Sequence, residues 1–165
     1  MKRRTLIAAS TAALLAGCGF QLRQAPDFIF ESIAINAPAT SPLATELRRS
    51  LAADGRVRVL PAGADVKQAS VVLDMPSELR EKVVVGLNAS GQVREFQLRS
   101  RVRFRLRTAG GKELIPDTEL LQQRDISFNE AAVLAKEAEE SLLYRDMQTD
   151  LVQQLLRRLA ALKTL

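Results

Sequence analysis

The feature that most constrains the fold is the alternation of arginine in the run LRSRVRFRLR, residues 98–107. Arginine occupies every second position of this run: Arg99, Arg101, Arg103, Arg105 and Arg107. Successive side chains of a β-strand point to opposite faces of the sheet, so the run predicts one strand with an apolar face and an arginine face. The arginine row extends about 30 Å over these positions. The apolar face must be covered by the rest of the fold, and the arginine face is expected to lie uncovered.

The arginine face has two interpretations. It is either an ordinary solvated face, whose charges are met by acidic side chains of neighbouring strands, or a binding face for an anionic ligand. The acidic residues expected as cross-strand partners are Glu78, Glu81, Glu119 and Asp125. Exposed pairs of this kind contribute little, about 0–1 kcal/mol each. In favour of a ligand, five like charges at this spacing repel one another, and the guanidinium group suits bidentate binding of phosphate or carboxylate.

The first residues predict export. Lys2, Arg3 and Arg4 precede an uncharged apolar run that ends at residue 17, which is the pattern of a secretory signal. The apolar run is shorter than the about 20 residues that a membrane-spanning helix needs. Leu15-Ala16-Gly17-Cys18 resembles a bacterial lipobox, in which the cysteine receives a diacylglycerol, and Cys18 is the only cysteine of the chain. We therefore expect a signal peptide over 1–17, a lipidated tether over 18–30 and a single domain over 31–165.

The lipid anchor changes how the chain and its charge are interpreted. Gly19 rather than aspartate follows the cysteine, which favours the outer membrane among such lipoproteins. Removal of residues 1–17 takes away three of the 24 basic residues and none of the 19 acidic ones, so 21 positive groups face 19 negative groups, a balance of +2. A globally basic protein that attracts nucleic acid is therefore not expected.

The sequence lacks the residues that several kinds of catalytic and binding site require. The chain has no histidine, which excludes histidine-based catalytic triads and histidine metal sites. It contains no glycine-rich phosphate loop, and a single cysteine forms no intramolecular disulfide. We expect no enzyme activity, no cofactor and no metal, although a hydrolase built on two carboxylates stays possible from composition.

The first half of the predicted domain begins with a strand, a helix and a strand. Residues 31–36 alternate apolar and polar side chains and predict a strand. Ser41 and Pro42 are typical of a helix start, the helix shows an apolar stripe of Leu43, Leu47 and Leu51, and Gly55 ends it. Residues 56–60 predict a second short strand, so that the segment reads as a βαβ unit.

Three longer strands and a helix are expected to follow. We predict strands over 69–87, with a bulge or an edge position at Pro76, over 92–108, and over 112–127, broken at Pro116. Turns at 88–91 and 109–112 join them into an antiparallel meander.

The last third of the chain predicts one long helix. Ser127 and Glu130 match a capping box. The helix stripe that we expect to pack on the sheet consists of Leu143, Met147, Leu151, Leu155, Leu159 and Leu162. The expected fold is α+β, a two-layer sandwich with a mixed or antiparallel sheet of about four strands and two helices packed on one face.

Short motifs occur in one order along the chain. Residues 18–23 read CGFQLR, and they are followed by a helix end at Asp54-Gly55 and the turn NASGQ at 88–92. The strand start EFQL at 95–98 and the helix start AKEAE at 135–139 come next, before the amphipathic tail to Leu162. In order and spacing the chain resembles the LPS-assembly lipoprotein LptE family over nearly the whole of 18–165.

The resemblance implies a fold of two helices on a four-stranded sheet, and a function without catalysis. Members of the family plug the lumen of the LptD β-barrel at the outer membrane in a 1:1 complex, help to assemble it, and bind lipopolysaccharide, including its lipid A, on its way to the cell surface. A basic residue at the position of Lys136 is one that the family uses for lipopolysaccharide. A second basic site lies in the turn before the long strand, where this chain has Asn88, Ala89 and Ser90, so that Arg94 is the nearest basic residue.

The lipopolysaccharide-binding residues expected from the resemblance and the arginine face together are Lys136, Arg94, Arg99, Arg101, Arg103 and Arg105. Lys136 also has an ordinary interpretation as a helix surface charge paired with Glu140. Two other functions stay open: a lipoprotein accessory of a phospholipid ABC transport system, which predicts an inner-membrane or periplasmic partner, and an anchored hydrolase, which needs two acids in a cleft, about 5–10 Å apart.

Overall fold

The fold begins with a parallel βαβ unit. The computed structural model describes residues 26–53 and 55–165, so the predicted signal, Cys18 and most of the tether lie outside the described residues. Strand β1 (Ser32–Asn36) is followed by helix α2 (Pro42–Ala52) and strand β2 (Arg58–Val59), and the two strands pair in parallel. This confirms the predicted strand, helix and strand.

Local chemistry explains where α2 begins. Ser41 precedes the helix with an extended backbone, and its hydroxyl oxygen accepts from the Ala44 N–H at 3.0 Å. Strand β2 has regular geometry over two residues and is shorter than the predicted 56–60. Hydrogen bonds from the Arg58 and Leu60 N–H groups to the carbonyls of Glu31, just before β1, and Ile33, both 2.9 Å, still tie this segment to the sheet.

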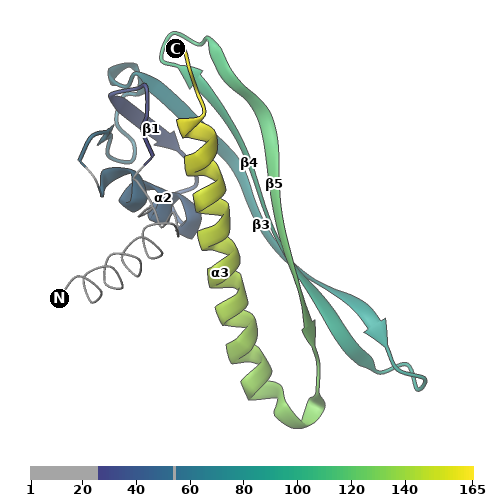
Figure 1. Ribbon diagram of the computed structural model, residues 1–165. Helices are drawn as coiled ribbons and strands as arrows, with labels where there is room; N and C mark the ends of the chain where they lie inside the picture. The colour runs from purple at the N-terminus through teal and green to yellow at the C-terminus, as the bar shows by residue number, and fades with distance from the viewer. Residues whose placement is uncertain (1–25, 54) are drawn as a thin grey trace, which may run out of the picture.

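Three long antiparallel strands form the rest of the sheet (Figure 1). They are β3 (Val71–Leu87), β4 (Val93–Thr108) and β5 (Glu113–Ser127), as the predicted meander requires. The strand order is β2-β1-β3-β4-β5, and β1 runs parallel to β3. The sheet is therefore mixed and has five strands rather than about four, because the short β2 joins its edge.

The two prolines in the strands have different effects. The register of β3 on β4 shifts between Asp74 and Ser77, which confirms the bulge predicted at Pro76. The predicted break of the last strand at Pro116 is wrong. Strand β5 continues through Pro116 with an irregular register opposite Arg105. The reason is that β5 is an edge strand, where a residue without an N–H is tolerated.

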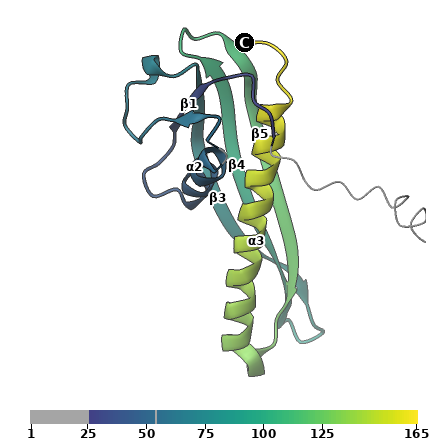
Figure 2. The same ribbon diagram turned by 60° about the vertical axis from the view of Figure 1, so that its left-hand side comes forward.

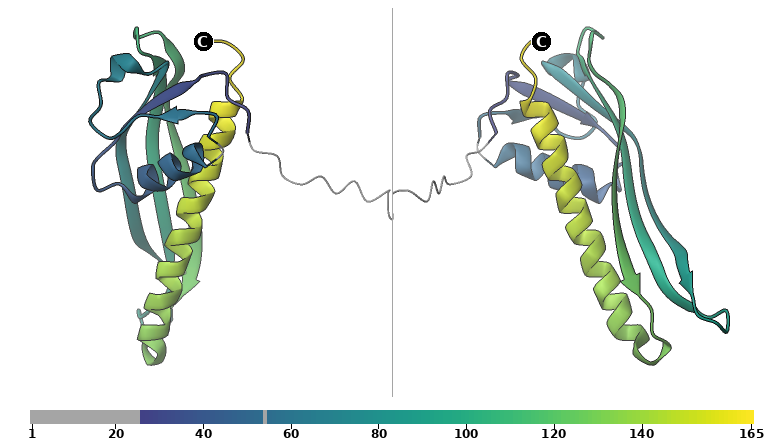
Figure 3. Two further views of the ribbon diagram at one scale, coloured as in Figure 1. Left: turned by 90° about the vertical axis from the view of Figure 1, so that its left-hand side faces the viewer. Right: turned by 45° about the vertical axis from the view of Figure 1, so that its right-hand side comes forward.

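Both helices lie on one face of the sheet (Figures 1 and 3). The long helix α3 (Val133–Ala160) crosses β4 and β5, and α2 packs beside the half of α3 nearest the C-terminus (Figure 2). No helix within the described residues is long and apolar enough to cross a membrane.

The start of α3 differs from the prediction. Ser127 is the last residue of β5 and does not cap a helix, so the predicted capping box is wrong. Pairing with Glu95 keeps Ser127 in the β-ladder. The chain then makes a 3₁₀ turn (Glu130–Ala132), whose first N–H groups are capped by Asn129, and the helix begins at Val133.

The core lies between the sheet and the helices. The apolar residues of the arginine run, Leu98, Val102, Phe104 and Leu106, are fully buried, which confirms the alternation. Four residues of the predicted α3 stripe, Met147, Leu151, Leu155 and Leu159, are fully buried as well. Leu43, Leu47 and Leu51 of α2 complete the main core cluster. Within the described residues, no α-helix lies on the opposite sheet face, where Leu60 and Ala69, on either side of the 3₁₀ turn η1 (Val66–Gln68), pack with Ala34 and Val72 in a smaller apolar cluster.

Candidate functional site

The five arginines of β4 form a column on the uncovered face of the sheet. Their positions alternate with the buried residues of the same strand, which places them away from the helices. We call these residues, Arg99, Arg101, Arg103, Arg105 and Arg107, the arginine column. Arg103 and Arg105 are the most exposed of those whose ion pairs are described, with side-chain exposures of 53% and 56%.

A buried carboxylate holds one end of the column. Asp74 on β3 is 5% exposed and accepts from Nε of Arg107 at 2.9 Å and from Nε of Arg105 at 3.1 Å. The side-chain amide of Asn36 on β1 donates to its other oxygen at 2.9 Å. Burial raises the pKa of Asp74, but the hydrogen bonds from Asn36, Arg107 and Arg105 outweigh it, so the pKa lies below its ordinary value.

The next arginines along the column also meet acidic or amide groups. Arg103 binds Asp117 of β5 with two hydrogen bonds, of 2.6 and 3.3 Å. Arg101 pairs with Glu81 of β3. Arg99 donates from Nε to the side-chain oxygen of Gln97 at 2.8 Å.

The predicted partners of the column are correct for Glu81 alone. Glu78 accepts from the Ser41 hydroxyl, and Asp125 accepts from the Gln97 amide. Glu119 lies opposite Arg103, but Arg103 turns to Asp117. Sequence reasoning missed both Asp74 and Asp117. Asp74 had a signal, since it is the one charge in the otherwise apolar stretch VVLDM, residues 71–75.

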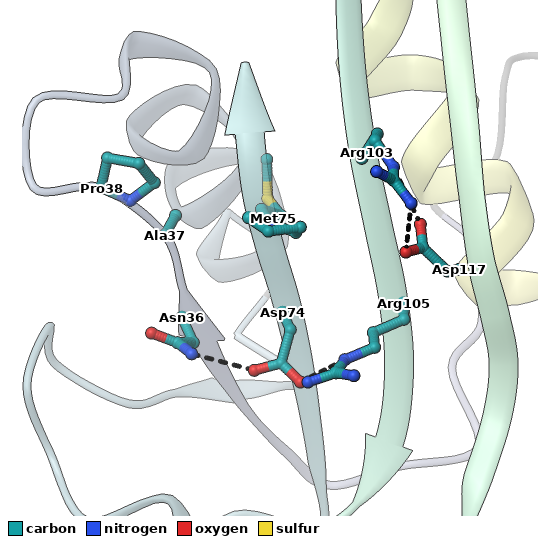
Figure 4. Close-up of a pocket in the computed structure, with 9 residues that line it drawn as sticks. Asn36, Ala37, Pro38, Asp74, Met75, Arg103, Arg105 and Asp117 are labelled. Atoms are coloured by element: carbon teal, nitrogen blue, oxygen red, sulfur yellow. Dashed lines mark hydrogen bonds and ion pairs between the residues drawn. The ribbon is translucent and has the colours of Figure 1, made fainter.

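A pocket of about 540 Å³ opens beside this end of the column (Figure 4). One wall is the β1–α2 loop with Ala37 and Pro38, and the floor includes the β3 bulge at Met75 and Pro76. Asn36, Asp74, Arg103, Arg105 and Asp117 supply its polar lining. Arg105 contacts Asp74 through Nε, and a guanidinium group has five N–H donors, so donors remain for an anion in the pocket.

The same pocket bears on the hydrolase alternative. Asp74 and Asp117 both line it, but each carboxylate is bound by arginine, and the pKa of Asp74 is lowered. A general acid needs the opposite, a raised pKa. Within the described residues there is also no group of three potential metal ligands among His, Cys, Asp and Glu side chains.

Lys136 and Arg94 lie away from the arginine column, at the end of the molecule where β5 connects to α3, which we call the distal end. Lys136 donates to the Ser127 hydroxyl at 3.0 Å and to Glu139 at 2.8 Å. The predicted partner, Glu140, is bound by Lys82 at 2.6 Å instead, because Lys82 lies within reach on the neighbouring strand β3. The ordinary interpretation of Lys136 as a paired helix charge is thus wrong about the partner, which is Glu139 at i+3 and not Glu140 at i+4.

A narrow apolar slot adjoins Lys136. Its lining has an apolar part and a charged part. Phe96, Ile126, Phe128 and Val133 form the apolar part, and Lys82, Lys136, Glu137 and Glu140 form the charged part. Arg94 lines a separate cavity on the other side of Phe128, whose N–H donates to the Arg94 carbonyl at 2.7 Å. Arg94 is exposed and lies at an irregular position of β4, between the residues opposite Gly86 and Leu87. The predicted site residues therefore form two groups, the arginine column and the pair Lys136 and Arg94 beside the connection from β5 to α3.

The family model of lipopolysaccharide-assembly, LptE, matches residues 30–159. The chain belongs to the LptE family. This confirms the resemblance drawn from the sequence motifs. A comparison with curated proteins finds no match.

Solved structures agree with the LptE fold. The solution NMR structure of an uncharacterized lipoprotein B from Nitrosomonas europaea is 38% identical, covers 87% of this chain and 91% of that one, and has a TM-score of 0.73. The crystal structure of the rare lipoprotein B from Shewanella oneidensis is 24% identical, with coverages of 79% and 94% and a TM-score of 0.63. A minor lipoprotein from Acinetobacter baumannii, 19% identical, covers 82% and 94% with a TM-score of 0.63, which shows the shared fold.

The turn at 88–91 is where this LptE-family chain departs from the basic site that the family resemblance implies. The turn at 88–91 is a compact one, in which the Asn88 side-chain oxygen accepts from the Ser90 and Gln92 N–H groups, both at 2.9 Å. Its residues carry no charge. Basic groups near this turn's end of the sheet are instead supplied by Arg94, Lys82 and Lys136, which line the two cavities beside Phe128.

Proposed function

We propose that this LptE-family chain is a non-catalytic lipoprotein, anchored in the outer membrane through Cys18. It plugs the lumen of an LptD β-barrel, helps to assemble that barrel and binds lipopolysaccharide during delivery to the cell surface. Family membership over residues 30–159 carries the proposal. The lipobox pattern at Leu15–Cys18 and the lipoproteins among the structural relatives support the anchor. The family match favours this role over an accessory of a phospholipid ABC transport system.

The arginine column is the proposed contact for phosphate groups of lipid A. Asp74, Asp117 and Glu81 offset part of its five positive charges, and an excess remains on the uncovered face. Guanidinium groups form bidentate hydrogen bonds with phosphate as they do with carboxylate. A phosphate therefore has donors to bind on Arg103 and Arg105 without displacing the buried Asp74.

The distal group, Lys136 and Arg94, is the second proposed contact. Lys136 stands at the mouth of the apolar slot of Phe96 and Phe128, next to Lys82. A cation beside an apolar slot suits an amphiphile with an anionic head group, because the head group can pair with the cation while the apolar part enters the slot. This combination supports a role of the distal end in contacting lipopolysaccharide.

The first experiment identifies the partner. The lipidated protein, purified from outer membranes with a C-terminal affinity tag, is expected to bring down LptD in a 1:1 complex. A preparation that contains no such barrel protein, or that contains an inner-membrane transporter instead, contradicts the proposal.

The second experiment tests the arginine column. Replacing Arg99, Arg101, Arg103 and Arg105 together with glutamine is expected to weaken lipopolysaccharide binding or docking in the barrel while the domain stays folded. A matched control removes the same charge from exposed arginines elsewhere: Arg49, Arg58, Arg145 and Arg157. Equal binding by the two quadruple variants would return the column to an ordinary solvated face.

A further inference from the structure

The half of β3 that leads to the turn before β4 has a free edge. Strand β1 pairs with β3 over Val71–Asp74, and then the chain leaves the sheet for the loop to α2. From Ser77 to Leu87, β3 pairs with β4 on one side and has no paired strand on the other within the described residues. We call residues 77–84, which precede the irregular register near the hairpin turn, the β3 free edge.

The register shows which backbone groups point outward. The Phe128 N–H, directly after β5, donates to the Arg94 carbonyl, and β4 pairs with β5 in regular register from Glu95 to Phe104. Even-numbered residues of β4 therefore turn their backbone groups to β5 and odd-numbered ones to β3. The β3 partners of the odd-numbered residues are Ser77, Leu79, Glu81 and Val83. The N–H and C=O groups of the residues between them, Glu78, Arg80, Lys82 and Val84, therefore face away from the sheet.

Helix α3 leaves this edge open, and the segment before α2 reaches its first residues. The Ser41 hydroxyl donates to Glu78, and residues 38 and 40–42 line a cavity together with Glu78 and Arg80. Helix α3 packs on β4 and β5, and α2 packs on α3 and β2. The distal hairpin of β3 and β4 diverges from α3 (Figures 1 and 3). Side chains of α3 reach β3 from the helix side, where Gln148 accepts from Arg80 and the Tyr144 hydroxyl donates to the Glu81 carbonyl, 2.7 Å each.

The two edges of the sheet differ in how they resist pairing. Strand β5 carries Pro116, an irregular register and several acidic side chains, which are devices that protect an edge. The segment from Ser77 to Leu87 also has charged side chains, at Glu78, Arg80, Glu81 and Lys82, but it has no proline, and Leu79 and Leu87 are 50% and 60% exposed. Apolar side chains beside unpaired backbone groups are the arrangement that accepts another strand.

We propose that the β3 free edge binds an extended polypeptide segment of a protein partner as a sixth strand. The side chains fix the preferred chemistry of that segment. Its residues opposite Leu79 and Val83 point to the uncovered face and are apolar. Its residues opposite Arg80 and Lys82 point to the helix side. An acidic residue there meets Arg80, which is held by the neutral Gln148, and shares Lys82 with Glu140, the partner of Lys82 on α3. The partner strand thus alternates apolar and acidic residues.

The probe is a capped nine-residue synthetic peptide that alternates valine with glutamate, carrying a fluorophore, and the protein is the full chain in detergent. Fluorescence anisotropy is expected to show saturable binding. The same peptide N-methylated along its backbone keeps its charge but loses its N–H donors, and a peptide of valine and lysine reverses the charge. Both are expected to bind at least about tenfold more weakly, a loss of about 1.4 kcal/mol.

A pair of variants locates the contact. Arg80→Ala and Arg80→Pro both remove the guanidinium group, but only proline removes the outward N–H, and it spares the ladder with β4. Arg80→Pro is expected to bind the peptide about tenfold more weakly than Arg80→Ala. Circular dichroism checks that both variants are folded, and amide hydrogen exchange of the unmodified protein is expected to show new protection at Arg80, Lys82 and Val84.

Several outcomes would overturn the proposal. These are no binding of the valine–glutamate peptide, equal binding of its N-methylated form, or new protection on β5 in place of β3. Protection of the same amides by self-association without peptide would identify a second copy of the chain as the occupant and equally overturn it. None of these measurements involves lipopolysaccharide or the barrel, so the proposed function stands or fails separately.

Discussion

Arg107 and Asp74 form a hydrogen-bonded ion pair between β4 and β3, with Nε of Arg107 2.9 Å from Oδ2 of Asp74. The same oxygen accepts from Arg105 at 3.1 Å, so one carboxylate compensates two like charges of the column. Asn36 adds a bond from β1. Asp74 therefore joins three strands at the point where the antiparallel meander meets the parallel βαβ unit.

Replacing Asp74 with asparagine is expected to lower the free energy of unfolding by about 2 kcal/mol, because two arginines lose their charged acceptor. Chemical denaturation of the variant and of the unmodified protein measures the difference. Asp125→Asn is the control, since Asp125 is exposed and accepts from the neutral Gln97. An equal effect of both substitutions would contradict a special role of Asp74.

The lowered pKa of Asp74 predicts acid sensitivity with a defined sign. Because the pKa is lower in the folded state than the ordinary value of 3.8, the stabilisation is complete above pH 3.8 and is lost as the pH falls toward the folded-state pKa. The unfolding free energy, measured between neutral pH and acid, is expected to fall less steeply in Asp74→Asn below that point. Parallel curves for the two proteins would count against this assignment.

Leu155 lies in the middle of the α3 stripe and is 0% exposed. Leu155→Ala is expected to destabilise the domain by about 2–5 kcal/mol, through lost burial and the cavity that remains. Leu134, 82% exposed on the same helix, provides the control, and Leu134→Ala is expected to change stability by less than about 0.5 kcal/mol. Thermal denaturation compares the two variants.

Lys136→Ala is expected to reduce lipopolysaccharide binding with little effect on folding, because the Lys136–Glu139 pair at the surface is worth only about 0–1 kcal/mol. The control is Lys67→Ala, which removes an exposed lysine from the 3₁₀ turn before β3, away from Lys136. Binding to immobilised lipopolysaccharide at two salt concentrations measures the effect. A loss of the same size in both variants would indicate a general charge effect rather than a site.

Patterns of short period predicted the elements well. The alternation of residues 98–107, the stripe of α3, and the start of α2 at Ser41 and Pro42 are all present in the structure. The capping box at Ser127 failed because a strand ladder and a helix cap competed for the same residue, and the ladder pairing with Glu95 prevailed. Local motifs contain no information about such long-range competition.

By itself the sequence determined the strand with two chemically different faces, the helices that cover the apolar face, and membership in the LptE family. Only the tertiary structure decided which carboxylates meet the arginines, because the irregular register at Pro76 turns Asp74 to the face of the column, and Arg103 pairs with Asp117 rather than with Glu119 opposite it. It also decided that Lys136 on α3 and Arg94 at the start of β4 lie beside the connection from β5 to α3, apart from the column. That separation follows from the packing of α3 on the sheet, which depends on contacts between residues far apart in the chain.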